Sequence, residues 1–192
     1  MLCLHGRAEN ERFAFDTLRV HEFARELQLE LQLISVDGGS HSYWHARNSG
    51  GSPVAEVVNE LLPREVPAFV IGWSMGGYGA LLAALEHPGV FSGVITSSAA
   101  VWNTHAESAR DAFDNAADFA AHDVWSRLDQ LANLPVRIDC GEDDPFVTAN
   151  RRLVAALPHA EGGISAGFHD SRFWRSVLPE QLRFIAGARP CR

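Results

Sequence analysis

Residues 68–85 read Ala68-Phe69-Val70-Ile71-Gly72-Trp73-Ser74-Met75-Gly76-Gly77-Tyr78-Gly79-Ala80-Leu81-Leu82-Ala83-Ala84-Leu85. This stretch predicts a short apolar strand, a tight glycine-rich turn and then a helix. Ser74 lies in the turn, and Gly72 and Gly76 complete a Gly-x-Ser-x-Gly pattern around it. At a strained turn of this kind the serine hydroxyl is exposed at the end of the sheet, and glycine lets the neighbouring backbones pass closely. We therefore expect Ser74 to be a nucleophile, with the free NH groups of the following helix directed at the reacting oxygen.

The composition is that of an ordinary globular protein and excludes several classes of partner. The 192 residues suffice for one well-filled core, so we expect one domain over residues 1–192. The 24 acidic and 16 basic residues give a net charge of -8, which argues against nucleic acid or an anionic membrane surface. No apolar run approaches membrane-spanning length, and the first residues lack the features of a signal peptide. We expect a cytoplasmic protein with no membrane span, and the sequence indicates no oligomeric state.

The three cysteines, Cys3, Cys140 and Cys191, lack the spacing of a metal site. Cys3 and Cys140 fall in apolar runs typical of strands, where cysteine serves as a small hydrophobic residue. We expect buried reduced thiols, no metal and no organic cofactor.

Apolar segments alternate with amphipathic ones, which predicts an α/β fold with a doubly wound, mainly parallel sheet of about six strands. We expect strands at residues 1–4, 31–36, 68–73, 93–98, 136–140 and 163–168. Helices are expected at about residues 9–29, 53–62, 75–87 and 170–185, the second with Ser52 as its N-cap and the last bent or reset at Pro179. Residues 102–133 form a small helical insertion in this interpretation. Ligands bind at the carboxyl ends of the strands in such sheets, so the site is expected in the loops that follow them.

A serine nucleophile needs a histidine to accept its proton and a carboxylate to orient that histidine. His169 follows the last expected strand and precedes the last helix, and we predict that it is the base. Five other histidines lie on or beside helices or in the insertion, where structural or pocket-lining roles are expected: His21, His87, His105, His122 and His159.

The acid is expected in the loop after the strand at 136–140, which offers Glu142, Asp143 and Asp144. Neighbouring side chains alternate in direction, so only one of the two aspartates can face the histidine. We prefer Asp144, and Asp143 or Glu142 remain alternatives.

Backbone NH groups must meet the oxyanion that forms during acyl transfer. One is expected from Met75, directly after the nucleophile, and the other from the His5-Gly6-Arg7 turn, where we assign it to Arg7. Further side chains at the strand ends are candidates for substrate contact, either as apolar walls or as a hydrogen-bonding group. These candidates are Ser42, Tyr43, Trp44, Trp73 and Trp102.

Five segments together resemble the esterase D type of α/β-hydrolases, which includes S-formylglutathione hydrolases, carboxylesterases and mycolyltransferases. They are LHGR at 4–7, VDGGSHSYWH at 36–45, GWSMGGYGALL at 72–82, CGEDDPF at 140–146 and GFHDSRFWRSVLP at 167–179. The resemblance implies the α/β-hydrolase fold, in which the catalytic residues follow the order serine, acid, histidine. It implies Ser74 as nucleophile, Asp144 before Pro-Phe as acid, His169 as base, and Arg7 and Met75 as the oxyanion pair.

The chain departs from this family at its N-terminus. The family normally has two antiparallel strands before the strand that ends in His-Gly, and the residues before Leu4 are too few to form them. We expect either a minimal six-stranded version or a start that lies further upstream, where there is room for a signal peptide.

These observations favour a serine hydrolase that cleaves carboxylic esters of small molecules through an acyl-enzyme intermediate. One alternative is an acyltransferase that moves the acyl group to an alcohol or a sugar. A second is a binding protein that keeps the fold without turnover.

Overall fold

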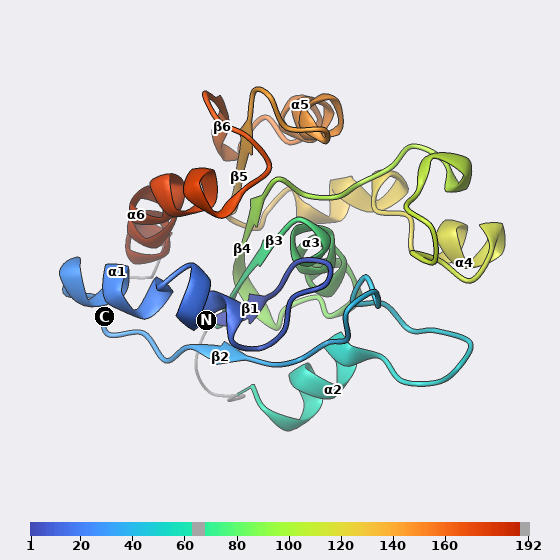
Figure 1. Cartoon of the computed structure of the whole chain (residues 1–192), viewed down its shortest axis with the longest axis horizontal. Coiled ribbons are helices and arrows are strands. Elements are labelled where there is room, and N and C mark those ends of the chain that lie inside the picture. The colour runs from blue at the N-terminus through green and yellow to red at the C-terminus, as the bar shows by residue number, and fades with distance from the viewer. Residues whose placement is uncertain (63–67, 189–192) are drawn as a thin grey trace.

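The computed structural model describes residues 1–62 and 68–188 and has a parallel sheet at its centre (Figure 1). Within this part of the chain the sheet has six strands in the order β2-β1-β3-β4-β5-β6, and every neighbouring pair is parallel. The strands are β1 (Leu2–Leu4), β2 (Ile34–Ser35), β3 (Ala68–Trp73), β4 (Phe91–Ser97), β5 (Val136–Gly141) and β6 (Glu161–Ser165). The predicted fold class, a mainly parallel α/β sheet of about six strands, is confirmed.

Helices cover both faces of the sheet and enclose two apolar cores (Figure 1). One face carries η1 (Phe13–Thr17), α1 (Val20–Glu26) and α6 (Ser171–Ala188), and the other carries α2 (Pro53–Glu60), α3 (Met75–Glu86) and α5 (Val147–Ala156). Side chains of β3 alternate between the two cores, with Val70 in one and Phe69 and Ile71 in the other. Burial on both faces explains why β3 is a continuous apolar run.

Several element boundaries differ from the prediction. The helix expected at 9–29 is split into η1 and α1, because Arg19 adopts a left-handed conformation with φ of 58°. Strand β6 begins at Glu161, before the predicted start, because it pairs with β5 from Arg137↔Glu161 to Gly141↔Ser165. Residues 166–170 therefore form a loop, and α5 was not predicted at all.

Helices α2, α3 and α6 were predicted with nearly correct limits. Ser52 caps α2, since its hydroxyl accepts a hydrogen bond from the backbone NH of Ala55. Helix α6 continues through Pro179 as one helix, where a bend or a reset was expected.

The predicted insertion at 102–133 consists of η2 (His105–Glu107), α4 (Ala116–Ala121) and η3 (Trp125–Leu131), and α4 extends far from the sheet (Figure 1). It is attached to α3 by the Tyr78 hydroxyl, which donates to the carbonyl oxygen of His122 at 2.8 Å.

Cys3 and Cys140 are buried free thiols, and burial raises the pKa of each to about 12. Cys191 lies outside the described residues. None of the helices described is both long and apolar enough to cross a membrane.

Candidate active site

Ser74 lies between β3 and α3 in a backbone conformation that side chains rarely adopt, with φ of 55° and ψ of -114°. The neighbouring glycines make this turn possible. A Cβ atom on Gly72 would lie 1.9 Å from the carbonyl oxygen of Gly76, and one on Gly76 would lie 1.9 Å from that of Leu4. The Gly-x-Ser-x-Gly pattern therefore has a steric cause in this fold.

The structure brings Ser74, His169 and Asp144 into one hydrogen-bonded chain. His169 Nε2 lies 2.9 Å from Ser74 Oγ, and His169 Nδ1 lies 2.8 Å from Asp144 Oδ2. Among the three acidic candidates, Asp144 is buried, whereas Glu142 and Asp143 are exposed. This geometry suits proton transfer from the serine to a histidine that a carboxylate orients.

Asp144 is held as a carboxylate. Burial by itself raises its pKa, but hydrogen bonds with His169, the Ser98 hydroxyl and the backbone NH of Phe146 outweigh burial and lower the pKa. The ionised form is the one that stabilises a protonated histidine.

Buried polar side chains hold the loops around this chain in place. Asn150 on α5 exchanges hydrogen bonds with the backbone of Ala99 after β4 and donates to the carbonyl oxygen of Phe146. Trp174 on α6 donates its indole NH to Ser98 Oγ at 2.9 Å and packs edge-on against the His169 ring. These hydrogen bonds link the loop after β4 to α6 and to the loop after β5 that holds Asp144.

The two predicted oxyanion donors lie at the same end of the sheet. Met75 is the first residue of α3, so its NH has no acceptor within the helix. Arg7 lines the pocket beside Ser74, and its guanidinium Nε donates to His41 Nδ1 at 3.0 Å.

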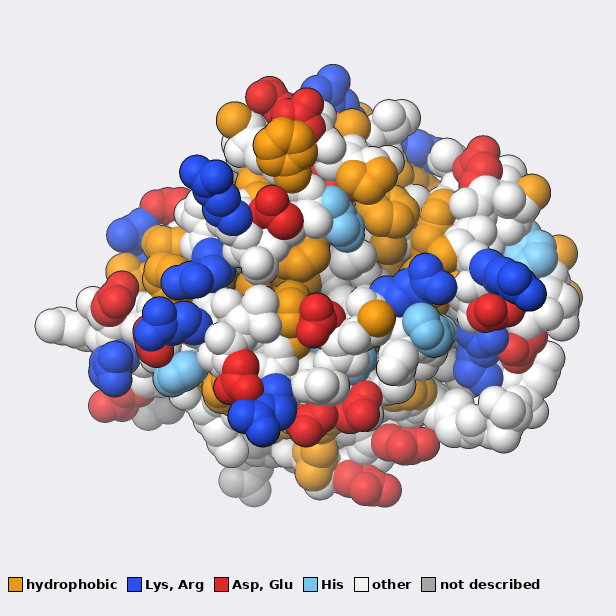
Figure 2. Space-filling view, in the orientation of Figure 1, with side chains coloured by type: hydrophobic (Ala, Val, Ile, Leu, Met, Phe, Trp, Pro, Cys, Tyr) orange, Lys and Arg blue, Asp and Glu red, His pale blue; other side chains and the backbone are white. Residues whose placement is uncertain are grey.

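A pocket of about 290 Å³ opens beside Ser74 and His169. Figure 2 shows hydrophobic side chains with a histidine among them in the hollow between the β6–α5 end of the molecule and the insertion. Its other lining residues are mostly apolar: Gly6, Arg7, Glu9, Phe13, Tyr43, Ala109, Phe146 and Trp174. Such a lining suits an apolar organic group.

The five predicted substrate-binding residues occupy different environments. Tyr43 lines the pocket, and Trp102 packs behind it with a ring-centroid distance of 5.0 Å. Ser42 Oγ is used within its own loop, where it accepts a hydrogen bond from the backbone NH of Trp44.

Trp44 and Trp73 are fully buried, so neither can contact a substrate, and their prediction as binding residues is wrong. Trp44 donates its indole NH to the carbonyl oxygen of His5 and fills the space left by Gly38 and Gly79. Trp73 points into the core beneath α6.

Four further pocket residues were not predicted from the sequence: Phe13, Ala109, Phe146 and Trp174. Phe146 has a usable signal, because it directly follows the predicted acid and Pro145. Phe13 and Ala109 reach the pocket only through the tertiary fold, which leaves no local pattern.

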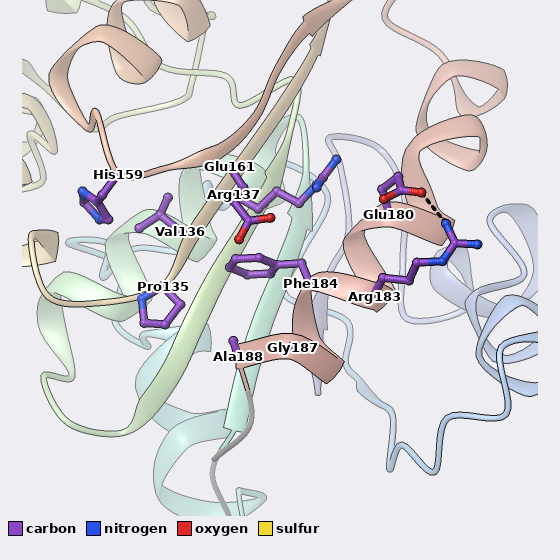
Figure 3. A pocket seen from close by; sticks show the side chains of 10 residues that line it. All are labelled: Pro135, Val136, Arg137, His159, Glu161, Glu180, Arg183, Phe184, Gly187 and Ala188. Carbon is purple, nitrogen blue, oxygen red and sulfur yellow. Dashed lines mark hydrogen bonds and ion pairs between the residues drawn. The ribbon is translucent and has the colours of Figure 1, made fainter. Parts of the chain in front are cut away.

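A larger pocket of about 440 Å³ lies at the amino ends of β5 and β6, at the opposite end of the sheet (Figure 3). Its two arginines are engaged, since Arg137 pairs with Asp139 and Arg183 pairs with Glu180. The described residues that line it include no hydroxyl or thiol nucleophile, so we place the candidate active site at Ser74.

Comparison with known families identifies the chain. The family model described as "Putative esterase" matches residues 54–185, the segment that holds Ser74, Asp144 and His169. The chain belongs to this esterase family. The resemblance predicted from its motifs is confirmed, and the esterase is a carboxylesterase-like serine hydrolase of the EC 3.1.1 type. No curated protein sequence matches it.

Solved structures share the fold of this esterase at low sequence identity. A ferulic acid esterase superposes with a TM-score of 0.81 and 22% identity, covering 98% of this chain and 84% of the other. The fluorophosphonate-binding serine hydrolase FphF of Staphylococcus aureus gives 0.77 and 21%, covering 98% and 83%. MPT51 of Mycobacterium tuberculosis gives 0.67 and 15%, covering 97% and 88%.

Proposed function

We propose that this esterase hydrolyses carboxylic esters of small organic molecules through an acyl-enzyme formed on Ser74. The observation that carries the proposal is the chain of hydrogen bonds from Ser74 Oγ through His169 to a buried, ionised Asp144. Family membership supports ester hydrolysis as the reaction.

In the proposed mechanism His169 Nε2 takes the proton of Ser74 as Oγ attacks the ester carbonyl. The resulting oxyanion is held by the backbone NH groups of Met75 and Arg7. Collapse breaks the bond to the alcohol, which leaves with the proton from His169. Water then attacks the acyl carbonyl while His169 Nε2 accepts its proton. The bond to Ser74 Oγ breaks, the acid is released, and Ser74 Oγ takes the proton back from His169.

The pocket lining suggests the kind of group that is bound. Phe13, Tyr43, Phe146 and Trp174 surround the space next to Ser74 with aromatic surface, and Arg7 and Glu9 lie at its rim. An apolar acyl or alcohol group of modest size fits this lining.

The test is covalent labelling of the purified protein with a fluorophosphonate, followed by mass mapping, alongside turnover of a short-chain p-nitrophenyl ester. We expect one label, on Ser74, and ester turnover that the label abolishes. Adding an acceptor alcohol to the assay and analysing the products separates hydrolysis from acyl transfer.

Ser74→Ala should lower turnover on the order of a millionfold, because the nucleophile of such a unit is lost. The variant should remain folded, since Ser74 Oγ contacts only His169 among the hydrogen bonds of the described side chains. Turnover by folded Ser74→Ala close to that of the wild type would overturn the proposal, as would labelling of another residue.

A further inference from the structure

A second cluster of chemically active side chains lies away from Ser74, where the loop after β2 meets the insertion. His45 belongs to that loop, and Asp118 and His122 lie one helical turn apart at α4. One potential ligand atom from each of the three residues lies within 4.8 Å of the others. His45 is completely buried, while Asp118 and His122 keep only 9% and 15% of their side-chain surface.

The nitrogens and oxygens of this cluster face one another at short range. Asp118 Oδ1 lies 2.9 Å from His122 Nδ1 and 3.6 Å from His45 Nδ1. The ligand atoms of a tetrahedral zinc ion are about 3.3 Å apart, given metal–ligand bonds of about 2.0–2.1 Å. The separations in the cluster, which reach at most 4.8 Å, must close toward this value when an ion binds.

The outward nitrogens of both rings face acceptors of the kind found behind zinc ligands. His45 Nε2 lies 2.9 Å from the carbonyl oxygen of Ala112, and His122 Nε2 faces Glu86 Oε1 at 4.0 Å. A proton on each Nε2 leaves both Nδ1 lone pairs for a metal, which then replaces the present contacts of these nitrogens with the carbonyl oxygens of Ala46 and Asp118, at 2.9 and 3.0 Å. Metal-binding histidines ordinarily donate their other NH to a carbonyl or a carboxylate, and of these two rings His45 has such a contact at hydrogen-bond distance.

The surroundings of His45 are rich in oxygen acceptors. Its Nδ1 lies 2.9 Å from the carbonyl oxygen of Ala46, so both ring nitrogens face oxygen acceptors. A neutral imidazole has one NH and satisfies only one of them. Arg47, the next cation along the chain, is paired with Asp114 and also donates to the carbonyl oxygen of Ala112 at 2.8 Å.

We propose that His45, Asp118 and His122 bind a divalent transition metal ion, with Zn²⁺ as the best match. Two imidazoles and one carboxylate favour zinc over magnesium or calcium, which prefer oxygen ligands. A water molecule completes four-coordination on the side where His122 is partly exposed.

The site joins two segments that shape the substrate pocket. Tyr43, two residues before His45, lines that pocket, and the Phe113 ring stacks on His45 at a centroid distance of 4.9 Å. Bound metal therefore fastens the insertion to the pocket wall. It takes no part in the chemistry at Ser74. No metal was expected from the sequence, and a ligand set divided between residue 45 and residues 118 and 122 leaves no local pattern there.

The test is titration of chelator-treated, full-length protein with Co²⁺, followed by visible absorption, and with Zn²⁺, followed by calorimetry. We expect one site per chain, a tetrahedral Co²⁺ spectrum and a higher melting temperature with Zn²⁺. His122→Gln should weaken binding by at least about a hundredfold, since replacing even an outer-shell partner costs about 10- to 100-fold. Asp118→Asn should do the same and serves if His122→Gln does not fold.

Two matched histidine variants serve as controls. His159→Gln removes a histidine that lines the pocket at the amino ends of β5 and β6. His169→Gln removes a histidine that, like His122, is paired with a largely buried carboxylate, here Asp144. Both should bind Co²⁺ and Zn²⁺ like the wild type. The proposal is overturned if the wild type shows no tetrahedral Co²⁺ spectrum, if folded His122→Gln and Asp118→Asn bind normally, or if His169→Gln loses the site.

Discussion

Asp143 and Asp144 are neighbours in sequence but have different surroundings. The Asp144 side chain is buried and accepts hydrogen bonds from His169 and from the backbone NH of Phe146. Asp143 is exposed, and its backbone NH donates to the carbonyl oxygen of Gly167. These surroundings favour Asp144 over Asp143 as the acid, the choice made from the sequence.

Asp144→Asn should therefore lower turnover about ten-thousandfold, because an amide orients the histidine in the wrong tautomer while the geometry persists. Asp143→Asn is the matched control and should change turnover by less than about threefold, the effect of altering one screened surface charge. Steady-state kinetics with a p-nitrophenyl ester measures both. The opposite ranking of the two variants would assign the acid to Asp143.

Single residues could be predicted from sequence where the chemistry is local. Ser74, Asp144 and His169 each follow a strand and belong to a recognisable motif, so they were named before the fold was known. Trp44 and Trp73 were misassigned because position at a strand end does not say whether a side chain turns outward or into the core. That outcome depends on Gly38 and Gly79, whose missing side chains leave room for the Trp44 indole.

At the scale of elements, the crossing of β1 and α3 is the tightest constraint on the site. The backbone of Gly76 lies against the carbonyl of Leu4, and Gly72 lies against the carbonyl of Gly76. These contacts bring the end of β1, and with it Arg7, next to the start of α3. The distance between the two proposed oxyanion donors is thereby fixed by glycine.

Gly76→Ala should destabilise the protein by about 3 kcal/mol or more, because its Cβ would meet rigid backbone at 1.9 Å. Gly187→Ala in α6 is the control, since a Cβ there meets nothing within 4 Å, and alanine should stabilise that helix by up to about 1 kcal/mol. Urea denaturation monitored by circular dichroism measures both. Equal midpoints for the two variants would show that the β1–α3 crossing adapts to a side chain.

Element limits could be predicted where one signal dominates and not where pairing decides them. The cap at Ser52 and the glycine turn at Ser74 marked helix starts correctly. The limits of β6 were misplaced because its glycine-rich sequence has little apolar pattern, and the pairing with β5 sets its register. Helix α5 was missed, since its polar residues include Asn150, which is buried for tertiary hydrogen bonds.

At the scale of the whole molecule, the site depends on the assembly of both cores. Phe173 and Trp174 at the start of α6 belong to the core on one face of the sheet, while Tyr43 and Met75 belong to the core on the other. The hydrogen bonds of Asp144 form only when these layers are packed together. The ionisation of Asp144 is therefore coupled to global folding. The free energy of unfolding at low pH consequently reports whether Asp144 is ionised in the folded protein.

The direction of that coupling follows from the shifted pKa values. Burial raises the pKa of Asp144, but its hydrogen bonds lower it below the ordinary value, so the native state binds a proton less readily than the unfolded chain. Stability from this group is present above the unfolded pKa and is lost as pH falls through the folded pKa. Asp139 has the opposite sign, because burial raises its pKa against the opposing effect of Arg137.

Urea midpoints measured from about pH 7 to about pH 3 should therefore separate the two carboxylates. Asp144→Asn should lose less stability than the wild type over this range, since the coupled proton uptake is gone. Asp139→Asn should lose more, because the wild type regains stability when the buried Asp139 is protonated. If Asp144→Asn kept the full acid sensitivity of the wild type, the carboxylate next to His169 would not be ionised in the folded protein, and its proposed role in stabilising protonated His169 would fail.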